Sequence, residues 1–291
     1  MKTGIYSALE LLPNSISDTI RNMSVINSID EIRLRINKPI SLSVLGRNEI
    51  TCMLASESDI EHTFKTAFSY SLHSYSKELS NGYIATKGGN RVGICGTAVI
   101  PNTNHNLVDT VKYISSINIR ISREVTGCAD NLISACNFPC GILIIGPPAS
   151  GKTTLLRDLA RIIGASYRVS LIDEQNEISA TYRNQVGCDV GCLTDVFVGY
   201  PKHIGITTAV KVMSPNVVIV DEIGTADDLK ALDYALHSGA KLVTAIHSDS
   251  LESAVKKPGI KHLIDTGAFD YCAVLEPYSC TKHSYKVIKL D

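Results

Sequence analysis

The stretch "GILIIGPPASGKTTLLRDLA", residues 141–160, decides the fold. It begins with a short apolar run of strand length, and its last part has the composition of a helix. Between them, "GPPASGKT" (146–153) matches the phosphate-binding pattern G-x-x-x-x-G-K-[ST]. In that pattern the loop amides and the positive end of the helix converge on a phosphate. The stretch therefore predicts a strand, a phosphate-binding loop and a helix.

The residues of this loop have distinct expected roles. Gly146 and Gly151 let the backbone wrap closely around a phosphate, and Lys152 reaches the β- and γ-phosphate oxygens. The hydroxyl of Thr153 is a ligand for Mg²⁺. We therefore expect ATP and Mg²⁺ as cofactors. The residues expected to contact the nucleotide are Gly146, Pro147, Pro148, Ala149, Ser150, Gly151, Lys152, Thr153 and Thr154.

A second motif, "NVVIVDEIG" (216–224), places two acids at the end of an apolar strand. We expect Asp221 to hold Mg²⁺ through water and Glu222 to orient and deprotonate the attacking water. An apolar strand ending in acids is common by itself, but here it follows a phosphate-binding loop. The second acid favours hydrolysis over phosphoryl transfer to another substrate.

Two further strand ends belong to the candidate site, because ligands of open parallel sheets lie beyond the carboxyl edge. "RVSLIDEQNEIS" (168–179) presents Glu174, and "KLVTAIHSDS" (241–250) presents His247. The alternative for the first stretch is an acidic loop that caps a helix. The alternative for His247 is an ordinary loop histidine. We expect both residues to support catalysis, as a second acid and as a sensor of the γ-phosphate.

The pattern of the chain changes near residue 125. Before it, alternating and helical patterns indicate hairpins at 30–51 and 82–99, a helix within 56–79 and a strand at 113–122. After it, short apolar strands alternate with helical segments, which predicts a mostly parallel sheet covered on both faces. The expected organisation is a small α+β domain at 1–125, a linker with a joining helix at 126–140, and an α/β nucleotide-binding domain at 141–291.

Composition excludes several classes of protein. With 44% hydrophobic and 20% charged residues the chain is typical of a folded globular protein, and its net charge of −1 disfavours sequence-independent nucleic-acid binding. No apolar run approaches the roughly 20 residues of a membrane helix. The start has no secretory pattern, so we expect a cytoplasmic location and free thiols for the nine cysteines.

The order of these motifs resembles the ATPases of type II and type IV secretion systems. The longer set "EIRLRINKPISL", "GNRVGICGTAV", "MSPNVVIVDEIG" and "LVTAIHS" resembles the stage III sporulation protein AA family of endospore-forming bacteria, from about residue 30 to 260. The resemblance implies a RecA-like hexameric ATPase of the mother cell. It also implies docking, from the cytoplasmic side, on integral membrane proteins of a channel to the forespore.

The resemblance also implies arginines that reach the γ-phosphate of a neighbouring subunit. Arg120 and Arg123, just before the linker, are the first candidates, with Arg91 and then Arg33 or Arg35 behind them. The alternative for these arginines is a solvated strand face, which Arg33 and Arg35 fit well because they are two residues apart.

Four functions remain, in order of preference. The first is an ATP-hydrolysing secretion-type motor, and the second is a nucleotide-gated hexameric scaffold with little turnover. A RecA-type nucleic-acid translocase is disfavoured by the near-neutral charge and the absence of tryptophan. A small-molecule kinase comes last, because no lid segment is recognisable.

Overall fold

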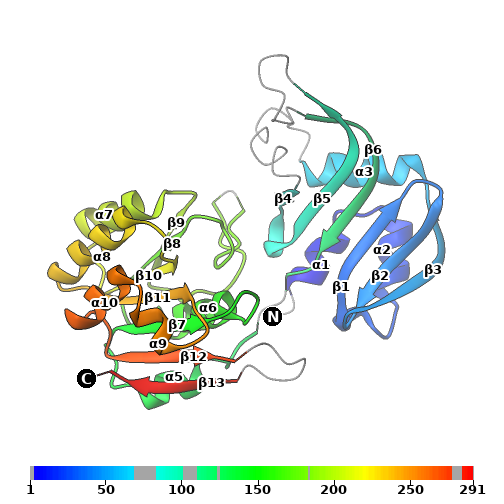
Figure 1. Ribbon diagram of the computed structural model, residues 1–291. Helices are drawn as coiled ribbons and strands as arrows, with labels where there is room; N and C mark the ends of the chain where they lie inside the picture. The colour runs from blue at the N-terminus through cyan, green and yellow to red at the C-terminus, as the bar shows by residue number, and fades with distance from the viewer. Residues whose placement is uncertain are drawn as a thin grey trace. The chain divides into compact units, whose positions relative to one another are not determined.

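The computed structural model describes residues 3–68, 83–100, 110–122, 125–182, 184–276 and 284–290. The chain divides into two compact units, which are drawn in Figure 1. The first unit comprises Met1–Glu124 together with Ala180–Gly187, and the second comprises Val125–Ser179 together with Cys188–Asp291. Each unit is described by itself.

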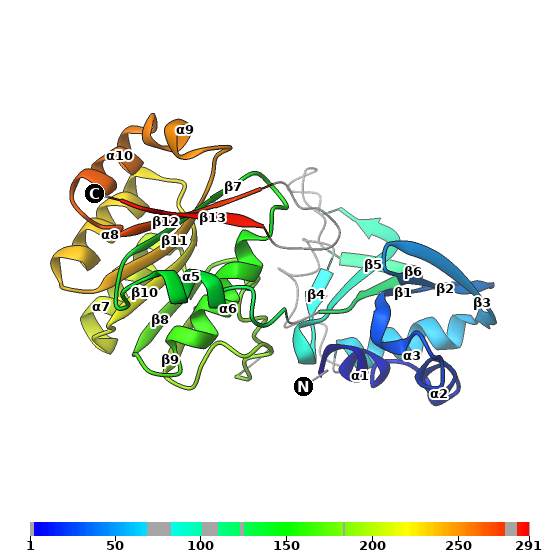
Figure 2. The same cartoon turned by 90° about the horizontal axis from the view of Figure 1, so that it is seen from below.

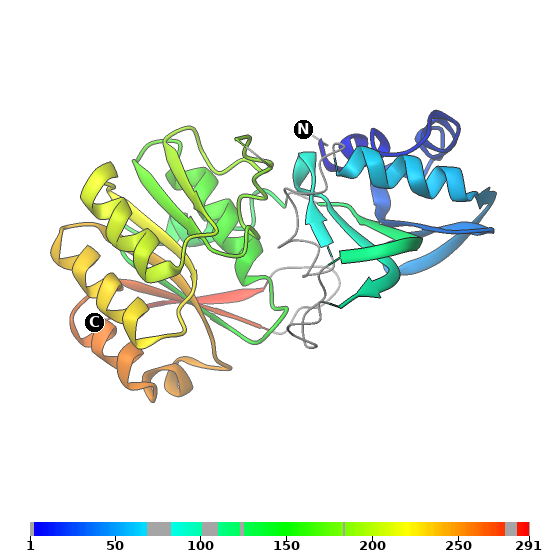
Figure 3. The same cartoon turned by 90° about the horizontal axis from the view of Figure 1, so that it is seen from above.

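The described strands of the first unit form a six-stranded antiparallel sheet in the order β3-β2-β1-β6-β5-β4. Helices α1, α2 and α3 lie on one face of it (Figures 2 and 3). The elements are α1 (Thr3–Leu9), α2 (Asn14–Arg21), β1 (Ile29–Arg35), β2 (Lys38–Val44), β3 (Arg47–Ala55), α3 (Glu57–Ala67), β4 (Tyr83–Ala85), β5 (Arg91–Val99) and β6 (Thr110–Arg120).

Local signals explain most of these elements. The hairpin predicted at 30–51 is confirmed as β1 and β2, with Asn37 at φ 57° in the turn, and β3 continues it as a further strand. The hairpin predicted at 82–99 is confirmed as β4 and β5. Helix α3 begins at a capping box in which the Ser56 side chain accepts from the Asp59 amide and the Asp59 side chain accepts from the Ser56 amide.

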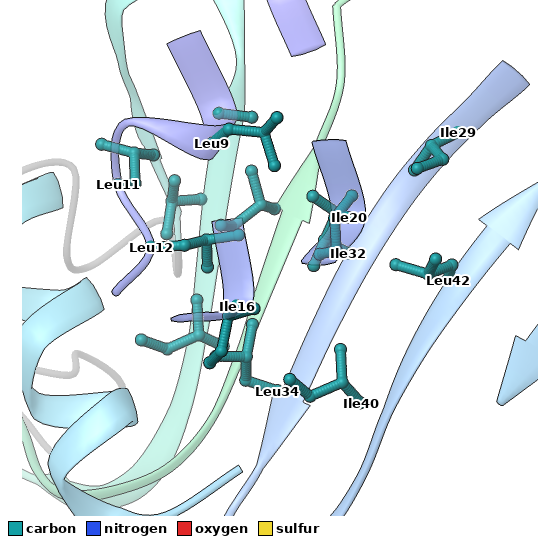
Figure 4. Packing of buried hydrophobic residues seen from close by; sticks show 14 of the residues in the cluster. Leu9, Leu11, Leu12, Ile16, Ile20, Ile29, Ile32, Leu34, Ile40 and Leu42 are labelled. Atoms are coloured by element: carbon teal, nitrogen blue, oxygen red, sulfur yellow. The ribbon is translucent and has the colours of Figure 1, made fainter. Parts of the chain in front are cut away.

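The core of the first unit lies between its sheet and its helices (Figure 4). Along β1, Ile32 and Leu34 are buried beside Ile16 and Ile20 of α2. Because side chains alternate between the two faces of a strand, the polar residues of β1 lie on the opposite, open face. This alternation places Arg33 and Arg35 of β1 on the same face.

The described strands of the second unit form a seven-stranded sheet in the order β13-β12-β7-β11-β10-β8-β9. Neighbouring strands are parallel except for β13, which is antiparallel to β12. The elements are α5 (Asp130–Ala135), β7 (Ile142–Gly146), α6 (Lys152–Ile163), β8 (Val169–Asp173), β9 (Thr194–Val198), α7 (Lys202–Met213), β10 (Val217–Glu222), α8 (Ala226–His237), β11 (Lys241–His247), α9 (Leu251–Val255), α10 (Pro258–Asp265), β12 (Tyr271–Leu275) and β13 (Tyr285–Lys289).

Both faces of this sheet are covered. Ile142 and Ile144 of β7 belong to a core that includes residues of α5 and α6, while Leu143 and Ile145 belong to a second core that includes residues of α7, α8 and α10. Strand β7 is apolar along its length because each of these residues faces one of the two cores. The predicted mostly parallel sheet, covered on both faces, is confirmed.

Strands β12 and β13 were not predicted from the sequence. Strand β12 pairs in parallel with β7, so it extends the sheet beside the phosphate-binding loop. The Tyr285 hydroxyl of β13 donates to the Cys128 carbonyl over 2.8 Å and accepts from the Leu132 amide over 3.2 Å, which ties this edge to α5. None of the helices in the described ranges is both long enough and apolar enough to cross a bilayer.

Candidate active site

Four parallel strands of the second unit end at one edge of the sheet, and each brings a candidate residue. Strand β7 ends at Gly146, which is opposite His247 of β11. Strand β10 ends at Glu222, which is opposite Ala245 of β11. Strand β8, the other neighbour of β10, ends at Asp173. The register therefore gathers groups that lie far apart in the sequence.

The loop between β7 and α6 has the backbone of a phosphate cradle. Gly151, at φ 95°, caps α6 in the left-handed region that favours glycine, and Ala149 has φ 58°. A Cβ at Gly146 would come within 2.5 Å of the Ser150 hydroxyl, so a larger residue would crowd the loop there. Within the described residues, the buried Ser150 hydroxyl has no hydrogen-bond partner, while Pro148 and Ala149 are exposed at the tip.

Lys152 lies inside this loop. Its Nζ donates to the carbonyls of Gly146 over 3.0 Å and Pro147 over 2.8 Å, and it lies 2.8 Å from Nδ1 of His247. Only 8% of the residue is exposed. Burial lowers the pKa of the Lys152 ammonium, against the opposing effect of Glu222 and of Asp221. The contacts place the positive charge where the loop would receive phosphate oxygens.

The second nitrogen of the same imidazole contacts the expected catalytic base. His247 Nε2 lies 2.8 Å from Oε2 of Glu222, and both side chains are about 40% exposed, at 41% and 39%. A register shift between Val220 and Glu222 inserts an extra residue into β10 at this point. Such bulges redirect side chains next to active sites. His247 thus contacts both Lys152 and Glu222, although the three residues were predicted separately from three motifs.

Asp221, the expected metal ligand, is anchored through its backbone, since its carbonyl accepts from the Thr244 hydroxyl over 2.9 Å. Burial raises the pKa of the Asp221 carboxyl; Lys202 opposes this rise, and Asp173 adds to it. In the parts of the chain that the structure describes, no three His, Cys, Asp or Glu side chains form a metal-binding group. A metal ion here would depend on Asp221, Thr153, phosphate and water.

The acidic loop after β8 has two different acids. The Asp173 carboxylate is fully buried and accepts from the amides of Glu177 and Ile178 and from both the amide and the hydroxyl of Ser179. These bonds make it the organising group of its own loop. Glu174, the residue predicted to support catalysis, is partly exposed and lies 3.4 Å from the Lys202 ammonium of α7.

Arg157 is a residue of this site that the sequence did not single out. From α6 it donates to the Ile178 carbonyl over 2.7 Å and to the Glu177 carbonyl over 2.6 Å. It thereby joins the helix that begins at Lys152 to the acidic loop. The spacing in "LLRDLA" gives no signal of this contact, because both acceptors are backbone atoms twenty residues or more away.

Four of the arginines that were candidates for action in a neighbouring subunit lie on the open face of the first unit's sheet. Arg120 is opposite Arg91 across β5 and β6, and Arg33 and Arg35 lie on the same face of β1. Arg123 lies outside the described residues.

One acid moderates the positive charge of that face. Glu31 Oε2 lies 2.7 Å from Nη2 of Arg33, and Glu31 Oε1 lies 3.5 Å from Nε of Arg120. Beside them is a hollow of about 290 Å³ whose lining includes Arg33, Gly93 and Asn118. The side chain of Arg120 is 65% exposed, so it is accessible on this unit.

The residues of the second unit fit a nucleotide with Mg²⁺. The unpartnered Ser150 hydroxyl, the left-handed turn at Gly151 and the ammonium of Lys152 inside the loop are all suited to a polyphosphate. Thr153 at the start of α6 and Asp221 at the end of β10 supply oxygen atoms of the kind that Mg²⁺ prefers.

Two solved structures show the same fold. The ATPase DotB of Legionella pneumophila is 16% identical, with 95% of this chain and 81% of that chain covered and a TM-score of 0.57. The pilus retraction motor PilT, solved with bound ADP, is 13% identical, with 95% and 82% covered and a TM-score of 0.64. At these identities the likeness shows the fold alone, and it agrees with the predicted RecA-like fold with a mostly parallel sheet.

Sequence comparison extends the likeness to a family. The chain is 34% identical to stage III sporulation protein AA of Bacillus subtilis (strain 168) over 271 residues, which cover 90% of this chain and 87% of that protein. It is also 26% identical to the uncharacterized protein ycf45 of Porphyra purpurea, covering 88% of this chain and 43% of that protein. The model of the family described as sporulation stage III, protein AA matches residues 6–283. This chain belongs to that family.

Proposed function

We propose that this chain hydrolyses ATP to ADP and phosphate with Mg²⁺ and uses the reaction as a motor. The observation that carries the proposal is the contact sequence Lys152, His247 and Glu222 at the carboxyl edge of the parallel sheet. It joins the residue expected to hold phosphate to the residue expected to activate water. An ammonium and a carboxylate linked in this way are suited to hydrolysis at a phosphate.

The residues around the phosphate-binding loop have distinct roles in this reaction. Lys152 binds the β- and γ-phosphates, and Thr153 and Asp221 hold Mg²⁺, which when bound neutralises charge on those phosphates. Glu222 orients the attacking water and takes its proton. Glu174 supports the site from the acidic loop.

The proposed machine follows from the family. We infer a homohexamer that acts from the cytoplasmic side on integral membrane proteins of a channel between mother cell and forespore. In that ring Arg120 and Arg123 reach the γ-phosphate of the neighbouring subunit. The description of PilT as a motor with bound ADP supports an energy-transducing role for this fold.

The test is phosphate release by the purified chain and by Glu222→Gln. We expect Glu222→Gln to bind ATP with the same affinity as the wild type. Its turnover should be about a hundredfold to ten-thousandfold lower, which is the range for removal of a general base. Glu252→Gln is the matched control, because Glu252 is an exposed acid on α9 of the same unit.

Two outcomes would count against the proposal. Equal turnover for the wild type and Glu222→Gln would remove the catalytic role of the acid. Binding of ATP by the wild type without phosphate release, in the presence of membrane partners, would favour a nucleotide-gated scaffold.

A further inference from the structure

The hydrogen-bond chain through His247 has a defined direction. An ammonium group only donates, so His247 Nδ1 accepts from Lys152 and carries no proton. The ring proton is therefore on Nε2, which donates to Glu222 over 2.8 Å. The imidazole thus lies between a positive and a negative group and bonds to both.

All three donors of Lys152 have acceptors in this arrangement: the carbonyls of Gly146 and Pro147 and Nδ1 of His247. A phosphate oxygen that binds Lys152 must replace one of them. The two carbonyls belong to the loop that surrounds the ammonium, whereas the imidazole can turn away about its side-chain bonds. A phosphate and His247 therefore compete for the same ammonium.

The backbone of His247 is held in place. It pairs with Gly146 in the sheet, and its carbonyl accepts from the Lys257 ammonium over 2.7 Å. The preceding residue, Ile246, is buried in the core. When the Lys152 contact is lost, the imidazole ring of His247 can therefore rotate while strand β11 stays in place.

We propose that His247 is a latch that reports the arrival of phosphate at the loop to Glu222. While Lys152 bonds to the imidazole, the same ring occupies one oxygen of the Glu222 carboxylate. When a phosphate takes Lys152, the ring is free to turn, and that carboxylate oxygen becomes available to water. His247 is a positioning residue in this scheme, which rests on the proposed function.

The latch predicts an unusual effect of His247→Ala. Removal of the competing acceptor strengthens binding of ADP, whose β-phosphate also uses Lys152, by about threefold to tenfold, the equivalent of one hydrogen bond. If His247 only contacted the γ-phosphate, its removal would weaken ATP binding and leave ADP binding unchanged.

The experiment titrates the full chain with fluorescent ADP and Mg²⁺. His247→Gln serves as the rescue, because its amide can accept from Lys152 and donate to Glu222, and it should return the ADP affinity toward that of the wild type. His237→Ala, at an exposed histidine of α8, is the matched control and should leave the affinity unchanged. Nitrogen-15 labelling of histidine gives a second readout, since the Nδ1 signal of His247 should change when ADP is added.

Each outcome has a clear meaning. Tighter ADP binding by His247→Ala, reversed by His247→Gln, supports the latch. Unchanged or weaker ADP binding by a folded His247→Ala overturns it, while the proposed hydrolysis stands. If the wild type binds no nucleotide, the proposed function fails and the latch fails with it.

Discussion

Substitution of Asp173 by alanine should release the acidic loop from the sheet. Four donors point at this carboxylate: the amides of Glu177, Ile178 and Ser179 and the hydroxyl of Ser179, at 2.7 to 3.2 Å for their shortest contacts. Ile178 is fully buried, so its amide would lose the carboxylate and would have no access to water, whereas the Ser179 hydroxyl also bonds to Oδ1 of Asn176 over 3.2 Å. A buried donor without a partner costs about 1–3 kcal/mol. Because the loop relaxes in part, we expect Asp173→Ala to lower the free energy of local opening of this loop by about 3 kcal/mol in total.

Hydrogen exchange measured by mass spectrometry is the assay, because it reports local opening in the full chain. A loss of about 3 kcal/mol corresponds to exchange roughly a hundredfold faster at the amides of 177–179. Asp195→Ala is the matched control, since Asp195 is an exposed acid on the neighbouring strand β9. Exchange in Asp173→Ala within about threefold of that in Asp195→Ala would show that these hydrogen bonds do not hold the loop.

Three further predictions concern single side chains. Lys152→Met should weaken ADP binding about tenfold to a hundredfold by loss of a charged donor, as measured by equilibrium titration. Burial raises the pKa of the Asp221 carboxyl above its ordinary 3.8, so between that value and the raised pKa the folded chain binds more protons than the unfolded chain. The contribution of Asp221 to the free energy of unfolding therefore falls as the pH rises through this window. Urea unfolding of Asp221→Asn at several pH values should lack that fall. Burial raises the pKa of the Cys128 thiol and of the Cys272 thiol to about 12, so few of these thiols are in the reactive thiolate form at pH 8. Iodoacetamide at pH 8 should therefore alkylate both at least about a thousandfold more slowly than the exposed Cys95. Equal alkylation rates would contradict this.

Local sequence signals predicted the architecture of the second unit. The strand, loop and helix around Lys152 follow from a motif within one short stretch, and the continuous apolar strands follow from burial on both faces. Strand β12 was missed because "YCAVL" is short and its pairing with β7 is a long-range contact that local patterns do not encode. The same limit applies to β13, whose place depends on that of β12.

The candidate site was predictable as a set of residues and not as a set of contacts. The sequence named Lys152, Glu222 and His247 from three motifs, but the contact of one imidazole with both of the others depends on strand register and on the bulge in β10. The sequence left it open whether the acidic stretch 168–179 supports catalysis or only caps a helix, and it gave no sign that Asp173 organises this loop through its hydrogen bonds. Arg157 was missed because its partners are backbone carbonyls.

The most direct test of the central claim is ATP turnover per chain across a series of protein concentrations, with particle mass followed by light scattering. We expect turnover to rise as the chain assembles and Glu222→Gln to assemble equally well without turnover. Rings of the wild type that release phosphate no faster than Glu222→Gln, with membrane partners present, would show that the chain is not an ATP-driven motor.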